Sequence, residues 1–170
     1  IQEMFNTDEL PLFGESDRLG RCKRWAPALP RIQFTHGHLS WAHQTSQDLS
    51  LDNTVMPYAN KKVALLVRSI PDVLSSMFAQ WVHRSVPPYP GNISDFIRDP
   101  RFGVEKIINW YSLWHAGRSS VSRLALFRYE DFQSDASREL QRLLAFWQIP
   151  IDQASVQAAV DFSSFDNMRK

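Results

Sequence analysis

The sequence predicts an α/β domain in which a mostly parallel β-sheet is flanked by helices on both faces. The first observation is that short apolar segments of strand length alternate with longer segments of helical periodicity. The second is that the strand connections are long enough for right-handed crossover helices. The third is length, since 170 residues are enough for one domain with its own core. We therefore expect residues 1–170 to belong to a single domain.

Three segments have the composition of strands. Residues 31–36 follow Pro30 and are ended by Gly37. Residues 62–68 (KVALLVR) are continuously apolar between two bases, as is typical of a strand covered on both faces. Residues 124–128 (LALFR) form the third strand. Because ligands of open α/β sheets bind beyond the carboxyl ends of the strands, those ends are the first place to look for a site.

Helical periodicity follows each of the two later strands. One helix is expected to open at Pro71, a second to begin at Asp99 and Pro100, and a third to be capped by Ser134 or Asp135. Their apolar stripes are, in chain order, Leu74, Met77, Phe78 and Trp81; Val104, Ile107, Ile108, Tyr111 and Trp114; and Leu140, Leu143, Leu144 and Trp147.

The remaining segments are less regular. Residues 43–60 are rich in polar side chains and are expected to form an excursion with at most one helical turn. Residues 86–91 (VPPYPG) predict a rigid loop, and a short helix is expected over residues 152–161. The loop, with Phe96 and Phe102, either caps the core, which we favour, or lines an apolar acceptor pocket.

Composition excludes several classes of protein. Hydrophobic residues make up 44% and charged residues 22% of the chain, as in ordinary globular domains and unlike disordered ones. The net charge of +1 argues against a nucleic-acid partner, and no apolar run is long enough for a transmembrane segment. Cys22 is the only cysteine, so no internal disulfide is possible, and we expect a cytoplasmic protein. The alternative is that the chain is the lumenal domain of a longer protein.

Arg68 ends the central strand, about two residues before a helix begins. A strand end that leads into a helix N-terminus favours anions, and a guanidinium suits phosphate oxygens. Ser76 lies off the apolar stripe of that helix, so its hydroxyl can face the same ligand. The alternative is that Arg68 is simply a surface or salt-bridged residue. The chain contains no glycine-rich phosphate loop of either common type.

His36 and Tyr129 follow the other two strands. A histidine at a strand end is a candidate general base, because its ordinary pKa is near 6.5. It is otherwise a hydrogen-bonded loop residue, and His38 is a rival for the same role. A metal site is not expected, because Cys22 is the only thiol and no helical histidine motif accompanies the pair. Tyr129 either stacks on a base or packs over the sheet.

Taken in order, these segments resemble the sulfotransferase family. The matching pieces are Thr35-His36, residues 62–76 (KVALLVRSIPDVLSS), residues 126–131 (LFRYED) and residues 163–168 (SSFDNM). They are similar to family segments that read approximately K-T-H, V-R-x-P-x-D-V-x-x-S, F-Y-E-D and T-S-F-x-x-M. The resemblance covers residues 31–170 and implies a P-loop-like sulfotransferase architecture.

The resemblance implies an activity and roles for individual residues. The family transfers a sulfuryl group from 3′-phosphoadenosine 5′-phosphosulfate (PAPS) to a hydroxyl or amine, leaves 3′,5′-bisphosphoadenosine (PAP), and needs no metal. The implied acceptor is a small molecule or a glycan. His36 resembles the catalytic base, Arg68 and Ser76 resemble the pair that holds the 3′-phosphate, and Tyr129 resembles the tyrosine beside the adenine. The residues that resemble the segment closing on the adenosine are Ser163, Ser164, Phe165 and Met168.

Three departures from the family pattern change the expectation. Phe34 stands where many members have a lysine, the phosphosulfate loop would lie upstream of His36 where no such loop is present, and the R-K-G segment would follow Lys170. We therefore expect an incomplete sulfotransferase domain with about half of the nucleotide site. The alternative function is a catalytically incomplete nucleotide-fold module that binds a partner or glycan. The oligomeric state is not predicted.

Overall fold

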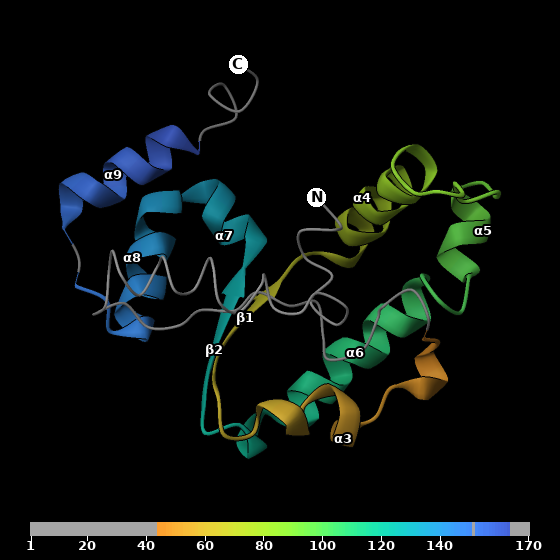
Figure 1. Ribbon diagram of the computed structural model, residues 1–170, viewed down its shortest axis with the longest axis horizontal. Coiled ribbons are helices and arrows are strands. Elements are labelled where there is room, and N and C mark those ends of the chain that lie inside the picture. The colour runs from red at the N-terminus through yellow and green to blue at the C-terminus, as the bar shows by residue number, and fades with distance from the viewer. Residues whose placement is uncertain (1–43, 151, 164–170) are drawn as a thin grey trace, which may run out of the picture. The chain divides into compact units, whose positions relative to one another are not determined.

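The computed structural model of the chain describes residues 44–150 and 152–163. These residues form two compact units, which are described separately (Figure 1). The first comprises residues 44–61 and 69–123, and the second comprises residues 62–68, 124–150 and 152–163. The architecture is α/β with a parallel sheet flanked by helices, which confirms the predicted fold class. The strand predicted over residues 31–36 lies outside the described residues.

The second unit contains the sheet. Among the described residues the sheet has two strands, β1 (Lys62–Val67) beside β2 (Arg123–Arg128), and α7 (Tyr129–Ser134) follows β2 directly. Phe127 of β2 is 2% exposed and packs near the rings of Phe132 and Phe146. Leu66 and Leu126, in contrast, are 56% and 50% exposed. The core of this unit therefore lies on the Phe127 side of the strand.

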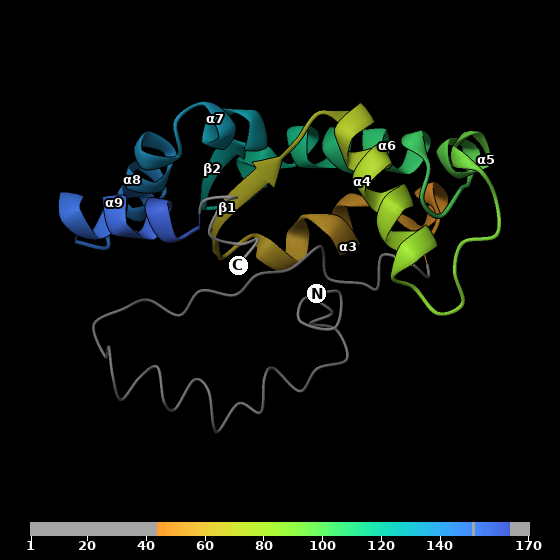
Figure 2. The ribbon, with the colours of Figure 1, turned by 90° about the horizontal axis from the view of Figure 1, so that it is seen from above.

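Two further helices complete this unit. The predicted cap at Asp135 is confirmed for α8 (Ala136–Trp147), because its carboxylate accepts a hydrogen bond from the backbone N–H of Arg138 at 2.9 Å. Gln148 is the C-cap of this helix, and its φ of 60° is left-handed, so that the backbone N–H of Ile149 bonds back to the carbonyl oxygen of Leu144 at 3.0 Å. Asp152 caps α9 (Gln153–Phe162) in the same manner. Figures 1 and 2 show α8 between α7 and α9, against both of which it packs.

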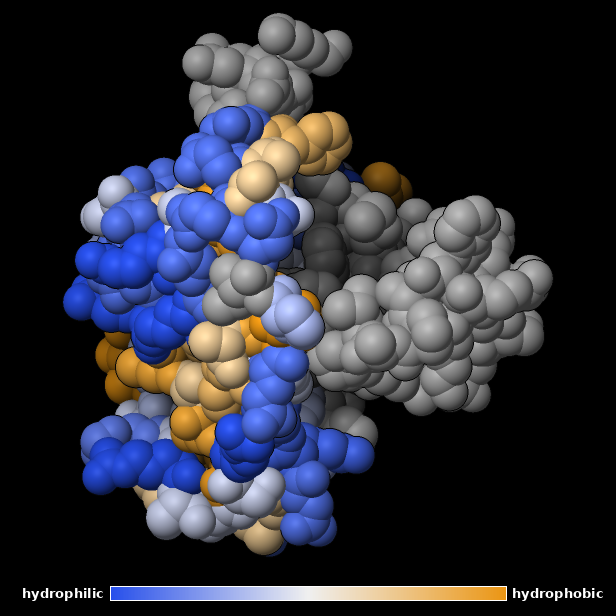
Figure 3. Space-filling model, turned by 90° about the vertical axis from the view of Figure 1, so that its left-hand side faces the viewer, coloured by the Kyte–Doolittle hydropathy of each residue, from blue (hydrophilic) through white to orange (hydrophobic). Residues whose placement is uncertain are grey.

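Apolar side chains also reach the surface of the molecule. Phe162, near the end of α9, is 81% exposed. Figure 3 shows apolar (orange) side chains lying among hydrophilic (blue) ones on one side of the molecule.

The first unit is helical. Its elements are η2 (Ser46–Asp48), α3 (Leu51–Thr54), η3 (Met56–Tyr58), α4 (Ile70–His83), α5 (Ile93–Arg98), α6 (Val104–Ala116) and η4 (Arg118–Ser120), where η denotes a 3₁₀-helix. Leu74, Phe96, Phe102 and Ile107 form its buried core. Phe96 and Phe102 stack with their ring centroids 5.3 Å apart. This confirms the favoured prediction that the two phenylalanines belong to the core.

The predicted start of the second helix was wrong. Asp99 is the C-cap of α5, and α6 begins at Val104 with Gly103 as its N-cap. The turn between the two helices is so tight that only glycine fits at position 103. A Cβ added at Gly103 would lie 2.3 Å from the carbonyl oxygen of Ile97. The Asp99 carboxylate accepts a hydrogen bond from the backbone N–H of Arg101 at 2.8 Å, so it stabilises this turn and does not cap α6.

Residues 44–58 are also more regular than the sequence indicated. They form η2, α3 and η3, which pack along α6 or on one another. The Asn109 side chain of α6 donates a hydrogen bond to the carbonyl oxygen of Ser46 at 2.7 Å. The backbone N–H of Ser46 donates to the carbonyl oxygen of Pro100 at 3.3 Å. The polar side chains of this segment cap its short helices, and its backbone forms the hydrogen bonds to α6 and to Pro100.

Candidate functional site

Arg68 is half-buried and directly follows β1. Its guanidinium carbon lies 4.3 Å from the centroid of the Tyr129 ring, within the range of a cation–π stack. Tyr129 is itself half-buried and directly follows β2. The pairing of two parallel strands therefore brings together two residues that are 61 positions apart in the chain. The structure thus joins two of the predicted site residues at the carboxyl ends of the strands.

Tyr129 is flanked by a charged pair. The Nε atom of Arg128 lies 3.8 Å from Oε2 of Glu130, and both side chains are substantially exposed. Such a pair contributes little to stability because water screens it. The stack with Arg68 is thus the more informative contact of this strand end.

Ser76 lies in the other unit, on the exposed face of α4. Its position off the apolar stripe is as predicted. A hollow of about 290 Å³ on this face is lined by Ser76, Ala79, Gln80, His83 and Arg84. The hydroxyl of Ser76 is accessible to a ligand there. That Arg68 and Ser76 bind the same phosphate stays a prediction.

The start of α4 has the features expected of a helix that follows a strand. Pro71 lies in the first turn, as predicted, and Ser69 is the N-cap. Asp72 also lies in the first turn, where its carboxylate is favoured by the helix dipole. Since a protein carboxylate is already present, the helix terminus alone is a weak basis for an anion site. Arg68 is the stronger one.

Ser163 is the C-cap of α9 and is exposed. Its hydroxyl donates a hydrogen bond to the carbonyl oxygen of Val160 at 3.1 Å. The other predicted site residues lie outside the described residues: His36, Ser164, Phe165 and Met168. Their roles stay predictions.

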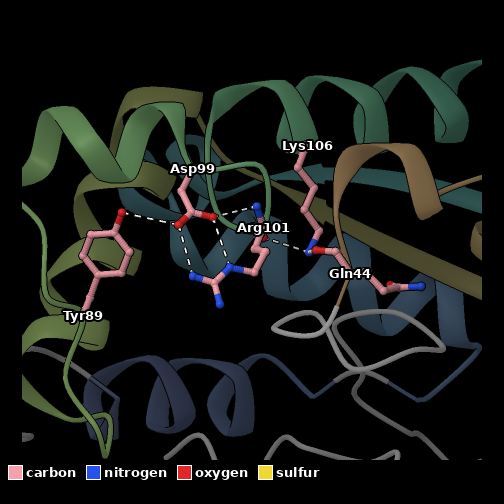
Figure 4. A network of polar contacts seen from close by, with 5 residues as sticks. All are labelled: Gln44, Tyr89, Asp99, Arg101 and Lys106. Atoms are coloured by element: carbon pink, nitrogen blue, oxygen red, sulfur yellow. Dashed lines mark hydrogen bonds and ion pairs between the residues drawn. The ribbon is translucent and has the colours of Figure 1, made fainter.

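A polar network that the sequence did not reveal surrounds Lys106 in the first unit (Figure 4). Lys106 is 0% exposed, and its Nζ atom donates hydrogen bonds to the carbonyl oxygens of Gln44 at 2.7 Å and Arg101 at 2.9 Å. Burial disfavours the charged ammonium and lowers the pKa of Lys106 to about 8. A lysine in a helix is ordinarily exposed, so no pattern in the sequence could have identified this one.

Asp99 forms the second half of this network. Its carboxylate lies 3.3 Å from Nη2 of Arg101 and accepts a hydrogen bond of 3.4 Å from the Tyr89 hydroxyl. Burial disfavours the charged carboxylate, but the hydrogen bonds from Arg101 outweigh it, so the pKa of Asp99 is lowered. Burial and the Asp99 carboxylate raise the pKa of Tyr89. The side chains of this network bond mainly to one another and to backbone carbonyls, which indicates a role in holding the turn.

Neither a metal-binding cluster nor a membrane-spanning helix occurs in the described part of the chain. Residues 44–150 and 152–163 contain no group of three or more His, Cys, Asp or Glu side chains arranged to hold a metal ion. None of the helices within these ranges has the length and apolar character needed to span a membrane.

The donor set at the end of β1 fits an anionic, aromatic ligand. Arginine supplies several N–H donors in one plane, which matches phosphate oxygens. A tyrosine ring beside it matches a ligand that carries both a phosphate and a base. Nucleotides have this combination of groups.

Comparison with known proteins gives one family. The family model described as Sulfotransferase domain matches residues 34–170. Sulfotransferase 1A1 from Rattus norvegicus is 26% identical over 144 residues, which is 83% of this chain and 46% of that protein. Sulfotransferase 1A1 from Bos taurus is 28% identical over 144 residues, with 83% and 45% covered. The chain thus spans about half the length of the curated relatives it matches.

A solved structure supports the same fold. The crystal structure of mouse sulfotransferase SULT7A1 complexed with PAP matches with a TM-score of 0.60 and 18% sequence identity. The match covers 86% of this chain and 51% of that chain.

Proposed function

The chain belongs to the sulfotransferase domain family, and from this premise we propose that its protein transfers a sulfuryl group from PAPS to an acceptor hydroxyl or amine. The observation that carries the proposal is the half-buried Arg68 guanidinium, stacked on Tyr129 at the carboxyl end of β1. Arginine at that edge of a parallel sheet suits a phosphorylated nucleotide. The complex of SULT7A1 with PAP, a nucleotide with a 3′-phosphate, supports the same ligand class.

Each predicted site residue has a role in this proposal. Arg68 and Ser76 bind the 3′-phosphate, and Tyr129 lies near the nucleoside. The adenosine moiety is closed in by Ser163, Ser164, Phe165 and Met168. His36 takes the proton from the acceptor group.

These roles meet the demands of sulfuryl transfer. The bound PAPS supplies the sulfuryl group, and the protein must position an acceptor in line with the bond that breaks. Arg68 and Ser76 hold the end of the nucleotide away from the reacting centre and so restrict its position. A neutral imidazole at His36 accepts the acceptor proton and makes the oxygen or nitrogen a better nucleophile. No residue of this set requires a metal.

A titration with PAP tests the nucleotide site. We expect Arg68→Ala to weaken the binding of PAP by about 10- to 100-fold, because one or two charge-assisted hydrogen bonds are lost. Arg98→Ala is the matched control, since Arg98 lies on α5 and bonds Ser94 of its own helix. We expect that variant to bind within about twofold of wild type. Equal affinities of all three proteins in calorimetry would contradict the Arg68 assignment.

A transfer assay on the full-length protein tests the base. We expect His36→Ala to reduce kcat by about 100-fold or more, the usual effect of removing a general base. His38→Ala is the control and is expected to keep most of the activity. Turnover near the wild-type rate in His36→Ala would overturn the assignment, and loss in His38→Ala alone would transfer the role to that residue.

The same assays separate the enzyme from the alternative function. A nucleotide-fold binding module would bind PAP and transfer no sulfuryl group to any phenol, amine or glycan acceptor. We propose a small-molecule or glycan acceptor and a cytoplasmic location, which fractionation of cells that express the full-length protein would test.

A further inference from the structure

Tyr129 contacts Arg68 because of strand pairing. Arg68 comes after Val67, the last residue of β1, and Tyr129 comes after Arg128, the last residue of β2. The two strands are parallel neighbours, so their carboxyl ends lie at the same edge of the sheet. The distance of 4.3 Å between the guanidinium carbon and the ring centroid follows from this arrangement.

The contact with the Tyr129 ring restrains the position of the Arg68 guanidinium. Arginine has a long side chain with many rotamers, and its five N–H groups lie at the edge of a plane. An aromatic ring packs against the face of that plane and fixes its tilt. The ring therefore limits the directions in which the donors point.

The stack also limits what else the ring can do. The ring face that Arg68 covers is not available for stacking on a base. A role for Tyr129 through Arg68 therefore differs from a role through the adenine, since the two act on different parts of the nucleotide.

We propose that Tyr129 is a positioning residue whose ring holds the Arg68 guanidinium in the orientation that binds the 3′-phosphate. The inference rests on the proposed function and deepens it, because it makes Tyr129 a determinant of selectivity for a 3′-phosphorylated nucleotide. Removing the ring then weakens only the interaction with the 3′-phosphate.

The test compares PAP with adenosine 5′-monophosphate, which lacks only the 3′-phosphate. Both are titrated by NMR, which covers millimolar affinities, against wild type, Tyr129→Ala, Tyr129→Phe, Arg68→Ala and the double variant Arg68→Ala/Tyr129→Ala. We expect Tyr129→Ala to weaken the binding of PAP by about 5- to 10-fold and the binding of the monophosphate by less than about twofold. Tyr129→Phe keeps the ring and is expected to stay within about twofold of wild type for both ligands.

The double variant shows whether the effect passes through Arg68. We expect Tyr129→Ala to add nothing to Arg68→Ala for PAP. Equal weakening of both nucleotides by Tyr129→Ala, or a loss that persists without Arg68, would assign the ring to the adenine and overturn the proposal. Tyr58→Ala is the control for general loss of packing, because Tyr58 is a half-buried tyrosine that contacts Trp114. It is expected to leave the ratio of the two affinities unchanged.

A measurement without nucleotide keeps the proposal separate from the proposed function. The ring current of Tyr129 is expected to shift the Arg68 Hδ and Hε resonances upfield in wild type and Tyr129→Phe, and this shift is expected to vanish in Tyr129→Ala. Absence of the shift in wild type overturns the inference by itself. A wild-type protein that shows the shift but binds no PAP overturns the proposed function, and the positioning role with it.

Discussion

Two cations of this protein are partly or wholly removed from water in different ways. Lys106 in the first unit is fully buried, and its ammonium donates to two backbone carbonyls. Arg68 in the second unit is half-buried, and its guanidinium is stacked on Tyr129 at the end of a strand. A buried cation whose donors bond the surrounding backbone stabilises the fold, whereas we assign the half-buried Arg68 at the strand end to ligand binding. We therefore expect variants of Lys106 to lower stability and variants of Arg68 to weaken nucleotide binding.

The largest expected effect is on stability. We expect Lys106→Ala to lower the free energy of unfolding by about 3 kcal/mol, because a cavity forms and the carbonyls of Gln44 and Arg101 lose their donor. Chemical denaturation measures this loss. Lys61→Ala is the control, since Lys61 is exposed, and is expected to change stability by less than about 0.5 kcal/mol. The affinity of the folded variant for PAP is expected to stay unchanged. A selective loss of nucleotide binding would contradict the structural role of Lys106.

A second stack of the same geometry tests whether stacking alone defines a ligand site. The guanidinium carbon of Arg142 lies 4.3 Å from the Phe127 ring centroid, but this side chain also bonds Glu139 and the carbonyl oxygen of Leu126. We expect Arg142→Ala to cost about 2 kcal/mol of stability, less than for a fully buried pair because Arg142 is 47% exposed. Nucleotide affinity should not change.

The matched control for Arg142 is a neighbour with the same partner. Arg138 also pairs with Glu139, at 3.2 Å, but is 62% exposed. We expect Arg138→Ala to cost less than about 1 kcal/mol. If the two variants destabilise equally in thermal unfolding, then burial of the pair does not decide its contribution.

The lowered pKa of Lys106 makes the stability of the protein depend on pH. Its folded pKa of about 8 lies below the ordinary value of 10.5, so the unfolded chain binds more protons between these two values. Stability therefore rises with pH across this window, by about 3 kcal/mol in total. Lys106→Met keeps most of the volume but cannot titrate, so we expect its stability to lack this rise. Parallel denaturation curves for both proteins from pH 8 to 10 would contradict the lowered pKa.

The smallest expected effect concerns Ser76. A single neutral hydroxyl hydrogen bond to a phosphate contributes about 1 kcal/mol, so Ser76→Ala should weaken PAP binding by about fivefold. Ser75→Ala is the matched control on the same helix, because the Ser75 hydroxyl already donates to the carbonyl oxygen of Pro71 at 2.8 Å. If Ser75→Ala weakens binding as much as Ser76→Ala, the loss reflects a change in α4 and not a contact with the ligand.

Features that depend on neighbouring residues were predicted well. The apolar run of β1, the proline at the start of α4 and the Asp135 cap of α8 are local, since each acts within about one turn or one strand. The order of short motifs was sufficient to identify the family, which the match over residues 34–170 confirms. The placing of Arg68 and Tyr129 at strand ends followed from the same local patterns.

Features that depend on distant residues were missed or misplaced. The start of α6 was wrong because Gly103 and the tight turn after α5, not the Asp99 side chain, determine it. Residues 43–60 were predicted to form an excursion with at most one helical turn, but residues 44–58 form short helices, of which η2 and α3 pack against α6, far along the chain. Nothing local distinguishes a lysine that points to solvent from one that is buried.

The sequence by itself therefore determined the fold class, the family and the residue types at the ends of the strands, because these follow from periodicity and short motifs. The tertiary structure alone decided that Lys106 is enclosed and that Tyr129 stacks on Arg68. The physical reason is that burial and side-chain contact depend on which segments pack together. Strand pairing and helix packing join residues that no local pattern relates.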